Sequence, residues 1–404
     1  MAAVPSVGRV AKTPAVPLVP ARFPLVLAAL LAAVAVVWWA LGWPLGVDSA
    51  VYRSGALAVL HGEPLYGPLT ATPDWSPELP FAYPPIAAVA FLPLAGLPVQ
   101  FAWGLLAVVT VLALHSSVRL VGGAWWVLPL VLVLEPVWRT VGLGQVNAVL
   151  MALVLLDVLV LRGSRWSGVL VGVAAAVKLT PLVFVAHLLL TGRRADALRA
   201  LGVFAGLGVT GFVLLPGDSV RYWTSTMLSA NSAGSNGWWG NQSVSGLVRR
   251  VLGDSGPVTA AVVLLVLCAA AYLVRDLHRR GDAVGALLVT AFCGVLVSPI
   301  SWTHHWVWAA PLCALLQARR RHGGLVAVVV LFTGWVFALV PRAEGRESSW
   351  TALESLAGNA YVLVALAVLG GLVLRRWRSS RGVAVVRSHS FRINAVLRMG
   401  KRTG

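Results

Sequence analysis

One aspartate follows the first long apolar segment of the chain almost directly. Asp48 lies in GVDSAVYRSG (46–55), just after VVWWALGWPL (36–45), and Tyr52 comes one helical turn later. A carboxylate held within hydrogen-bonding reach of a hydroxyl nucleophile can take its proton as a general base. The same charge at a bilayer surface can also be a solvated interfacial group, so the surroundings of Asp48 decide between the two interpretations.

A lysine inside an apolar segment is the second candidate. Lys178 lies within SGVLVGVAAAVKLTPLVFVAHLLL (167–190), and Pro181 cannot continue a helix. At about 1.5 Å per residue, each half of this segment reaches only about halfway across a ~30 Å hydrocarbon core. Non-helical backbone and a charge at that depth require a water-filled cavity. We therefore expect Lys178 at the floor of a cavity that opens outward, where a compact cation suits a phosphate.

A second apolar hairpin has a polar apex. The segment EPVWRTVGLGQVN (135–147) collects Arg139, Gln145 and Asn147 between two apolar stretches. Arg139 could help Lys178 to bind a phosphate. We expect this apex to lie toward the outside as well.

Two adjacent histidines interrupt an apolar stretch near the C-terminal third of the chain. His304 and His305 lie in SPISWTHHWVW (298–308), at a predicted outer membrane edge rich in tryptophan. Neighbouring residues point to different faces of a helix, so a shared metal ion is not expected. One histidine that hydrogen-bonds substrate or phosphate is the favoured interpretation.

An outer segment rich in tryptophan and amides offers a third kind of chemistry. Trp238, Asn241 and Gln242 lie in or beside NSAGSNGWWGNQS (231–243). Aromatic faces combined with amides suit the recognition of sugars. An aromatic girdle at the membrane interface explains the same pattern equally well.

The composition identifies the class of protein that must position these groups. The chain has 404 residues, of which 58% are hydrophobic and 11% charged, so a polytopic membrane protein is indicated. The net charge of +18 comes from short basic clusters between apolar runs. Such clusters mark cytoplasmic loops and attract anionic membrane lipids, so we expect no nucleic-acid partner. The three cysteines lie inside apolar runs and indicate neither a disulfide framework nor a zinc site.

The basic clusters predict an all-α protein that crosses the membrane about twelve times, with both termini in the cytoplasm. We expect a cytoplasmic N-terminal tail (1–23), a transmembrane catalytic domain (24–374) and a basic cytoplasmic C-terminal tail (375–404). The long loops, 45–82 and 216–256, are outside, and 83–97 forms a juxtamembrane or re-entrant helix there. The predicted spans are 24–44, 99–118, 124–138, 146–161, 167–178, 181–190, 198–215, 257–274, 283–298, 303–317, 323–340 and 353–374.

Together these residues resemble glycosyltransferase family 87, whose members are actinobacterial mannosyltransferases of the GT-C fold. The resemblance rests on five ordered motifs: GVDSAVYRSGALAVLHGEPLYG (46–67), FAYPPIAAV (81–89), GQVNAVLM (144–151), AAAVKLTPL (174–182) and SWTHHW (301–306). Tyr52 and Tyr83, in the first two motifs, join the candidate substrate-binding residues.

The resemblance carries functional expectations. It implies an enzyme of the plasma membrane that transfers mannose from polyprenyl-phosphate mannose to a mannosylated glycolipid, of the phosphatidylinositol mannoside or lipomannan type. The new linkage would be α-1,2, formed with inversion on the extracytoplasmic side. Asp48 would be the base, and Lys178 matches the lysine-x-x-proline segment of the family. No metal and no other cofactor is implied.

Two alternatives stay open from the residues alone. One is an arabinofuranosyltransferase that uses decaprenyl-phosphoryl arabinose. The other is a lipid or sugar transporter, because transporters also contain broken helices and charges at the midplane of the membrane. The long outer loops with their carboxylates favour an enzyme.

Overall fold

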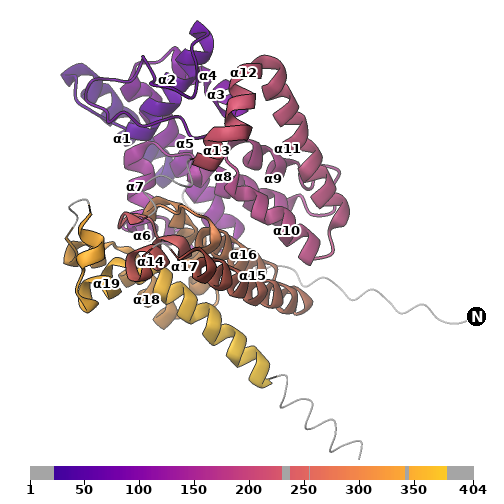
Figure 1. Cartoon of the computed structure of the whole chain (residues 1–404). Helices are drawn as coiled ribbons and strands as arrows, with labels where there is room; N and C mark the ends of the chain where they lie inside the picture. Colours follow the sequence, from indigo (N-terminus) through magenta and orange to yellow (C-terminus); the bar gives the residue numbers. More distant parts are fainter. Residues whose placement is uncertain (1–21, 230–236, 254, 342–344, 380–404) are drawn as a thin grey trace, which may run out of the picture.

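The computed structural model describes residues 22–229, 237–253, 255–341 and 345–379 (Figure 1). No strand occurs in these ranges, where one isolated antiparallel bridge pairs Asn241 with Trp302. The all-α class predicted from the sequence is therefore confirmed. Nearly all of the predicted N-terminal tail (1–23) and most of the C-terminal tail (375–404) lie outside the described residues.

The N-terminal half of the described chain is a series of long and short helices. In order they are α1 (Arg22–Leu41), α2 (Val47–His61), α3 (Pro85–Ala90), α4 (Leu92–Ala95), α5 (Val99–Leu120), α6 (Val127–Val131), α7 (Glu135–Leu143), α8 (Asn147–Leu155), the π-helix η1 (Leu156–Val160), α9 (Val169–Val177), the 3₁₀ helix η2 (Thr180–Leu182), α10 (Val183–Leu190) and α11 (Arg194–Leu214).

The C-terminal half continues in the same way. It contains α12 (Pro216–Arg221), the π-helix η3 (Tyr222–Thr226), α13 (Met227–Ser229), α14 (Val244–Leu252), α15 (Gly256–Arg279), α16 (Ala283–Val297), the 3₁₀ helix η5 (Thr303–Trp308), α17 (Ala309–Ala318), α18 (His322–Phe332), the 3₁₀ helices η6 (Trp335–Leu339) and η7 (Arg346–Ser349), α19 (Ala352–Gly358) and a last helix, Ala360–Ser379.

Five described helices are long and apolar enough to cross a membrane: α1, α5, α11, α15 and the last helix. Helix α7 and the continuous α8–η1 helix are bent by 116° relative to each other, and they make a sixth span if this pair is counted as one. The protein is therefore a multi-pass membrane protein. Length and composition support five or six spans, against the twelve predicted crossings.

Interrupted helices and short apolar helices, such as α16 and α18, account for the difference in number. The predicted span 124–138 is split, because α6 ends at Val131 and α7 begins at Glu135 with Pro136 in its first turn. The predicted span 303–317 begins as the 3₁₀ helix η5 and becomes α-helical only at Ala309.

The outward faces of the long helices are apolar. Leu25 and Leu30 of α1 and Leu264 and Leu265 of α15 each expose more than half of their surface. Long apolar helices that bury so little of their surface match the hydrocarbon of a bilayer.

The predicted helix break at the lysine is confirmed. Helix α9 ends at Val177, Lys178 has an extended backbone (φ −149°, ψ 132°), and η2 begins at Thr180 with Pro181 in its first turn. Because proline lacks the N–H that a continuing helix needs, α9 does not continue through this point.

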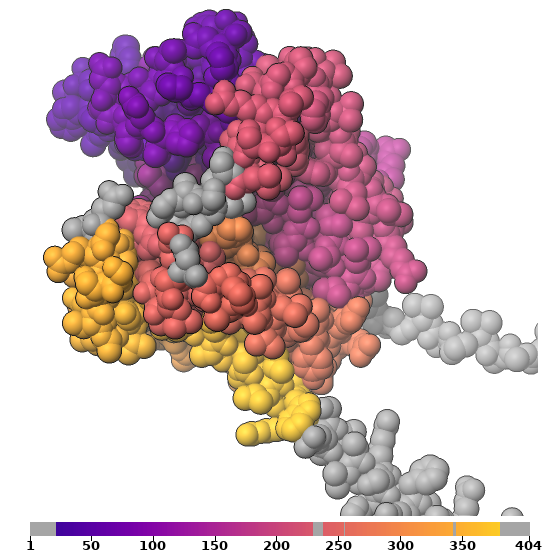
Figure 2. All heavy atoms as spheres, in the orientation of Figure 1, coloured from indigo at the N-terminus to yellow at the C-terminus, as the bar shows by residue number. Residues whose placement is uncertain are grey.

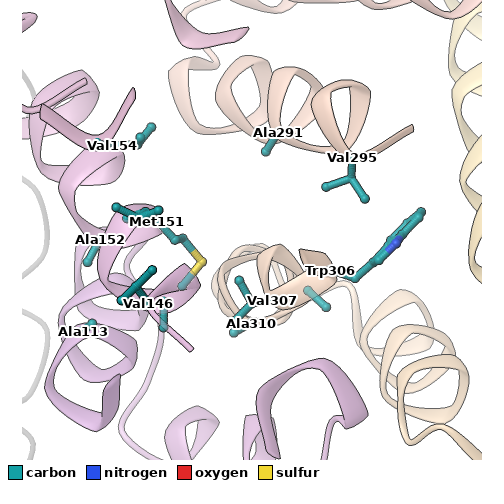
Figure 3. Close-up of a cluster of buried hydrophobic side chains, with 14 of the residues drawn as sticks. Ala113, Val146, Met151, Ala152, Val154, Ala291, Val295, Trp306, Val307 and Ala310 are labelled. Atoms are coloured by element: carbon teal, nitrogen blue, oxygen red, sulfur yellow. The ribbon is translucent and has the colours of Figure 1, made fainter. Parts of the chain in front are cut away.

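A buried apolar cluster supports the histidine segment from behind (Figure 3). Side chains at the start and along α8 meet those of α16 and of η5–α17; they include Val146, Met151, Val154, Ala291, Val295, Trp306, Val307 and Ala310. Trp306 is fully buried, and its indole N–H donates to the Gln242 carbonyl at 3.2 Å. This packing fixes η5, the element that carries His304 and His305.

Candidate active site

One large cavity collects most of the predicted site residues. Its volume is about 1590 Å³, and Asp48, Tyr83, Lys178, His304 and His305 all line it. Figure 2 shows the surface hollowed between the lobe that holds α2 and α12 and the lobe that holds α14 and α19. Tyr52, Arg139, Gln145 and Trp238 also line this cavity.

Two glycines set the position of Asp48. Gly46, just before α2, has a left-handed φ of 77°, and a Cβ there would lie only 2.6 Å from the Trp103 ring. Gly144, which ends α7, has a φ of 68°, and a Cβ there would lie 2.7 Å from Ser49. These close approaches place Asp48, in the first turn of α2, beside the turn that carries Gln145.

A hydrogen-bonded chain holds the Asp48 carboxylate. Gln145 Nε2 donates to Asp48 Oδ2 at 2.8 Å and to the Tyr83 hydroxyl at 3.2 Å. The hydroxyls of Tyr83 and Tyr52 lie 2.9 Å apart, and the Tyr52 ring stacks on Phe91. Because both amide protons of Gln145 are used, its side chain holds one orientation, and that orientation holds Asp48.

Burial changes the chemistry of this carboxyl group. It raises the pKa of Asp48, while the hydrogen bond from Gln145 and the charges of Lys178 and Arg139 lower it less strongly. The pKa of Asp48 therefore lies above its ordinary value, which makes the ionised carboxylate a stronger base.

The Lys178 ammonium joins three separate segments. Nζ donates to Asn147 Oδ1 at 2.9 Å, lies 3.1 Å from His305 Nε2, and sits 5.5 Å from the centre of the Tyr83 ring. Since an ammonium only donates, we assign the facing His305 nitrogen as the acceptor, with the ring proton on Nδ1. Two of the three ammonium protons point to Asn147 and His305, which leaves one for a ligand in the cavity.

His304 has an unusual environment. Its side chain is only 6% exposed, and neither ring nitrogen has a hydrogen-bond partner among the described residues. Buried polar atoms are normally paired, so these two ring nitrogens are exceptions, in a residue that lines the cavity.

Arg139 reaches the cavity from α7 and is held by a buried carboxylate. Its Nε lies 3.5 Å from Glu135 Oε1, and its guanidinium lies 5.8 Å from the centre of the Trp239 ring. Glu135 also accepts from the Thr303 hydroxyl at 2.6 Å and from the Tyr361 hydroxyl at 3.3 Å. The spacing of Glu135 and Arg139 by four residues could have predicted their pairing, whereas nothing in the sequence pattern indicates Thr303 or Tyr361.

Three predicted ligand-binding amides serve other groups in the structure. Asn147 does not line the large cavity; it holds Lys178 through Oδ1, and its Nδ2 lies 3.4 Å from the His304 carbonyl. Asn241 and Gln242, expected to face a sugar, are fully buried. Asn241 bonds Ser301 N and the Pro299 carbonyl, and Gln242 bonds the carbonyls of Trp239 and Gly358. Buried backbone groups need partners, and these amides supply them.

No group of three or more His, Cys, Asp or Glu side chains suited to a metal ion occurs in the described part of the chain. The expectation of metal-independent chemistry remains a prediction.

Residues 81–299 match the sequence profile of glycosyltransferase family 87. The chain belongs to this family. The resemblance inferred from the five motifs and the predicted enzyme class, a glycosyltransferase, are thereby confirmed.

Similar family 87 proteins occur in mycobacteria. A polyprenol-phosphate-mannose-dependent α-(1-2)-phosphatidylinositol mannoside mannosyltransferase of Mycobacterium tuberculosis is 37% identical, over 81% of this chain and 84% of the relative. Its Mycolicibacterium smegmatis counterpart is 35% identical, over 84% and 87%. A phosphatidylinositol pentamannoside mannosyltransferase of M. tuberculosis is 37% identical, over 80% of each chain. No solved structure matches at a significant level.

Proposed function

We propose that this protein transfers mannose from polyprenyl-phosphate mannose to a phosphatidylinositol mannoside, forming an α-1,2 linkage on the extracytoplasmic side of the plasma membrane. The observation that carries the proposal is the cavity shared by Asp48 and Lys178, a partly buried base and a partly buried cation, in a chain more than a third identical to enzymes named for this donor.

The reaction needs one base. The acceptor hydroxyl attacks the anomeric carbon of β-mannosyl phosphate, and the bond from that carbon to the phosphate oxygen breaks. Asp48 takes the hydroxyl proton while Gln145 keeps its carboxylate oriented. Attack from the face opposite the leaving group inverts the configuration and yields an α-mannoside.

The leaving group needs positive charge. Lys178 and Arg139 line the same cavity; Asn147 of α8 holds Lys178, and Glu135 of the same helix α7 holds Arg139. They would stabilise the negative charge that develops on polyprenyl phosphate as the bond breaks. His304 and His305 line the same cavity, and one of them would contact the phosphate or the transferred sugar.

A lipid-linked donor fits this architecture better than a nucleotide sugar. A nucleotide sugar is usually bound by a strand–turn–helix unit with a glycine-rich turn, and the described residues contain no strand. A polyprenyl chain can remain in the bilayer while its sugar phosphate enters the cavity.

We also propose the GT-C arrangement, with about twelve crossings, cytoplasmic termini and the cavity open to the outside. The basic clusters at Arg193/Arg194 and Arg319/Arg320/Arg321 support this orientation, because basic loops favour the cytoplasm. The shorter apolar helices, such as α16, would cross as parts of bent or re-entrant segments.

The experiment uses purified full-length protein in liposomes. With polyprenyl-phosphate mannose and a phosphatidylinositol mannoside acceptor, we expect a product one mannose longer, formed equally well in a metal chelator. With GDP-mannose alone, in a preparation free of lipid-linked mannose, we expect none. Turnover with GDP-mannose would refute the proposed donor.

The same assay separates the remaining alternatives. Transfer from decaprenyl-phosphoryl arabinose in place of the mannose donor would identify an arabinofuranosyltransferase. Movement of the lipid across the bilayer without any new glycosidic bond would identify a transporter.

A further inference from the structure

The wall of the cavity formed by the C-terminal half contains a group of residues that the reaction above does not use. Trp238, Trp302 and Glu347 all line the cavity, and Ser348 lies beside them. Trp302 and Glu347 were not among the residues singled out from the sequence. The three residues come from different parts of the chain. Trp238 lies in the segment before α14, Trp302 directly precedes η5, and Glu347 lies in η7.

The rings of Trp238 and Trp302 meet nearly at right angles and form an angled aromatic surface. Their ring centroids lie 5.3 Å apart with an angle of 75° between the planes, and both rings are only half-buried. A Cβ on Gly240 would overlap the Trp238 ring, so the glycine permits the ring to lie where it does.

The buried amides hold this surface in place. Asn241 pairs with Trp302 in the isolated bridge, and its side chain accepts from Ser301 N at 2.9 Å. Gln242 N donates to the Ser301 carbonyl at 2.7 Å. The two tryptophan-bearing segments are thus joined by backbone and amide hydrogen bonds, which gives the aromatic wall a fixed geometry.

Glu347 adds a carboxylate to the aromatic wall. It is 8% exposed, and its Oε1 accepts from the Trp239 N–H at 3.2 Å. A carboxylate has about four acceptor positions, and the described contacts use one of them. A sugar ring has apolar C–H faces and hydroxyl donors at its edge. Its faces suit the tryptophan rings, and its hydroxyls suit a buried carboxylate beside them.

The size of the cavity leaves room for such a ring. Sites for one drug-sized ligand measure roughly 300–1,000 Å³, and this cavity measures about 1590 Å³. A mannosyl phosphate at Lys178 and Asp48 would fill only part of it. The wall of Trp238, Trp302 and Glu347 remains for a second ligand.

From these observations we propose that Trp238, Trp302 and Glu347 form an acceptor subsite that binds a mannose other than the one that is attacked. This inference rests on the proposed function. The ligand class is the oligomannosyl head group of a glycolipid. One sugar would pack on the tryptophan rings and donate hydroxyl hydrogen bonds to Glu347, while the reacting sugar reaches Asp48.

The test compares two acceptors that differ by one sugar. Wild-type protein is assayed in liposomes with polyprenyl-phosphate mannose and either an alkyl α-mannoside or the matched alkyl dimannoside. A subsite for the additional sugar predicts a higher kcat/KM for the dimannoside, by about tenfold or more, since it adds a hydrogen bond to a charged group.

Two substitutions then remove the subsite in different ways. Glu347→Gln keeps an oxygen for the Trp239 N–H, and Trp302→Leu removes the ring. Each should lower kcat/KM for the dimannoside about tenfold, with less than about a twofold change for the monomannoside. Trp302→Phe, which keeps an aromatic face, should restore part of the preference. Glu354→Gln, at a partly exposed acid that caps α19 and does not line the cavity, is the matched control and should keep the wild-type ratio.

Other outcomes would overturn the subsite. Equal kcat/KM for both acceptors in the wild type would mean that the additional sugar is not bound. An equal fall for both acceptors in the variants would show a general defect, and unchanged ratios would show that these residues bind no sugar. If wild-type protein transferred nothing from the donor to either acceptor or to a phosphatidylinositol mannoside, the proposed function itself would fail, and the subsite with it.

Discussion

The Asp48 carboxylate is subject to opposing influences. Burial disfavours its charged form, whereas the Gln145 hydrogen bond and two nearby cations favour it, and burial dominates. Gln145 also fixes the position of Asp48, and Asn147 and His305 fix the position of the Lys178 ammonium. Each group that would do chemistry is therefore held by a neighbour from another segment, and substitutions can separate the reacting group from the group that positions it.

Replacing the base while keeping its shape tests the role of Asp48. Asp48→Asn should lower the transfer rate about a hundredfold or more, because an amide cannot accept the hydroxyl proton. Donor binding should persist, since the phosphate contacts remain. Transfer and donor binding are measured with the purified variant in liposomes. Asp74→Asn, an exposed acid of the same outer segment, is the control, and near-normal transfer by Asp48→Asn would exclude a base role.

The raised pKa of Asp48 predicts a pH dependence. The active form is the ionised carboxylate, so kcat/KM should fall as the pH is lowered through the raised pKa. Gln145→Leu removes a bond that favours the charged form, so the acid limb should move to higher pH. Gln100→Leu makes the same change at a glutamine that bonds the Trp43 carbonyl, and it should leave the limb in place. An unmoved limb in Gln145→Leu would argue against titration of Asp48.

Removing the cation tests the phosphate site. Lys178→Met should raise the KM for the donor roughly ten- to a hundredfold, the range expected for a lost charged hydrogen bond. Arg221→Met, at an exposed outer arginine that does not line the cavity, should leave the KM unchanged. Thermal melting in detergent checks that both variants are folded. An unchanged donor KM together with an unchanged rate would rule out the phosphate role of Lys178.

At the scale of elements, breaks between helices create the site. Lys178 lies in the gap between α9 and η2, Gln145 lies in the turn between α7 and α8, and Asp48 lies in the first turn of α2, after a short link from α1. At each break, backbone N–H and C=O groups leave the helical hydrogen-bond pattern. These groups and the polar side chains beside them can then face the cavity. The cavity lies where these interruptions meet.

Two glycines at one such link provide a matched comparison. Gly42 (φ 66°) and Gly46 (φ 77°) both have left-handed backbones, so alanine at either costs about 1–2 kcal/mol. Only at Gly46 would the new Cβ also collide with Trp103, since nothing lies within 4 Å at Gly42. Gly46→Ala should therefore lower the melting temperature in detergent and the transfer rate more than Gly42→Ala. Equal losses would mean that packing under Asp48 does not matter.

At the scale of the whole molecule, the cavity separates two lobes, and its sidedness decides which substrates can reach it. In the proposed orientation, the segments that carry Asp48 and Asp74 face the outside, and the arginine clusters face the cytoplasm. A lipid donor and a glycolipid acceptor both partition into the bilayer, so a cavity between membrane-embedded lobes can receive both.

The proposed orientation can be measured directly. In a background without Cys268, Cys293 and Cys313, a cysteine at Asp74 should react with a membrane-impermeant maleimide in intact cells. Cysteines at Arg194 and Arg320 should react only after permeabilisation, because basic loops remain in the cytoplasm. If the cysteine of Arg194→Cys were labelled in intact cells, or the cysteine of Asp74→Cys were not, the proposed topology would be wrong.

The sequence by itself determined the parts that depend on local chemistry. The high hydrophobic content and long apolar runs predicted a helical membrane protein. Pro181 predicted the break beside Lys178, and the ordered motifs predicted the family. These features depend on hydrophobicity, on the missing N–H of proline and on residues near one another in the chain, all of which can be seen without a fold.

Only the tertiary structure decided which side chains meet. It joined Gln145 to Asp48 and Asn147 to Lys178, and it showed Asn241 as a buried support rather than a residue facing the cavity. It also brought Trp302 and Glu347 to one wall. Such pairs are 31 or more residues apart, and an amide can satisfy a buried carbonyl or a sugar hydroxyl with the same atoms. Residue type and spacing cannot distinguish these partners, because the choice depends on which groups the packed helices leave buried and unpaired.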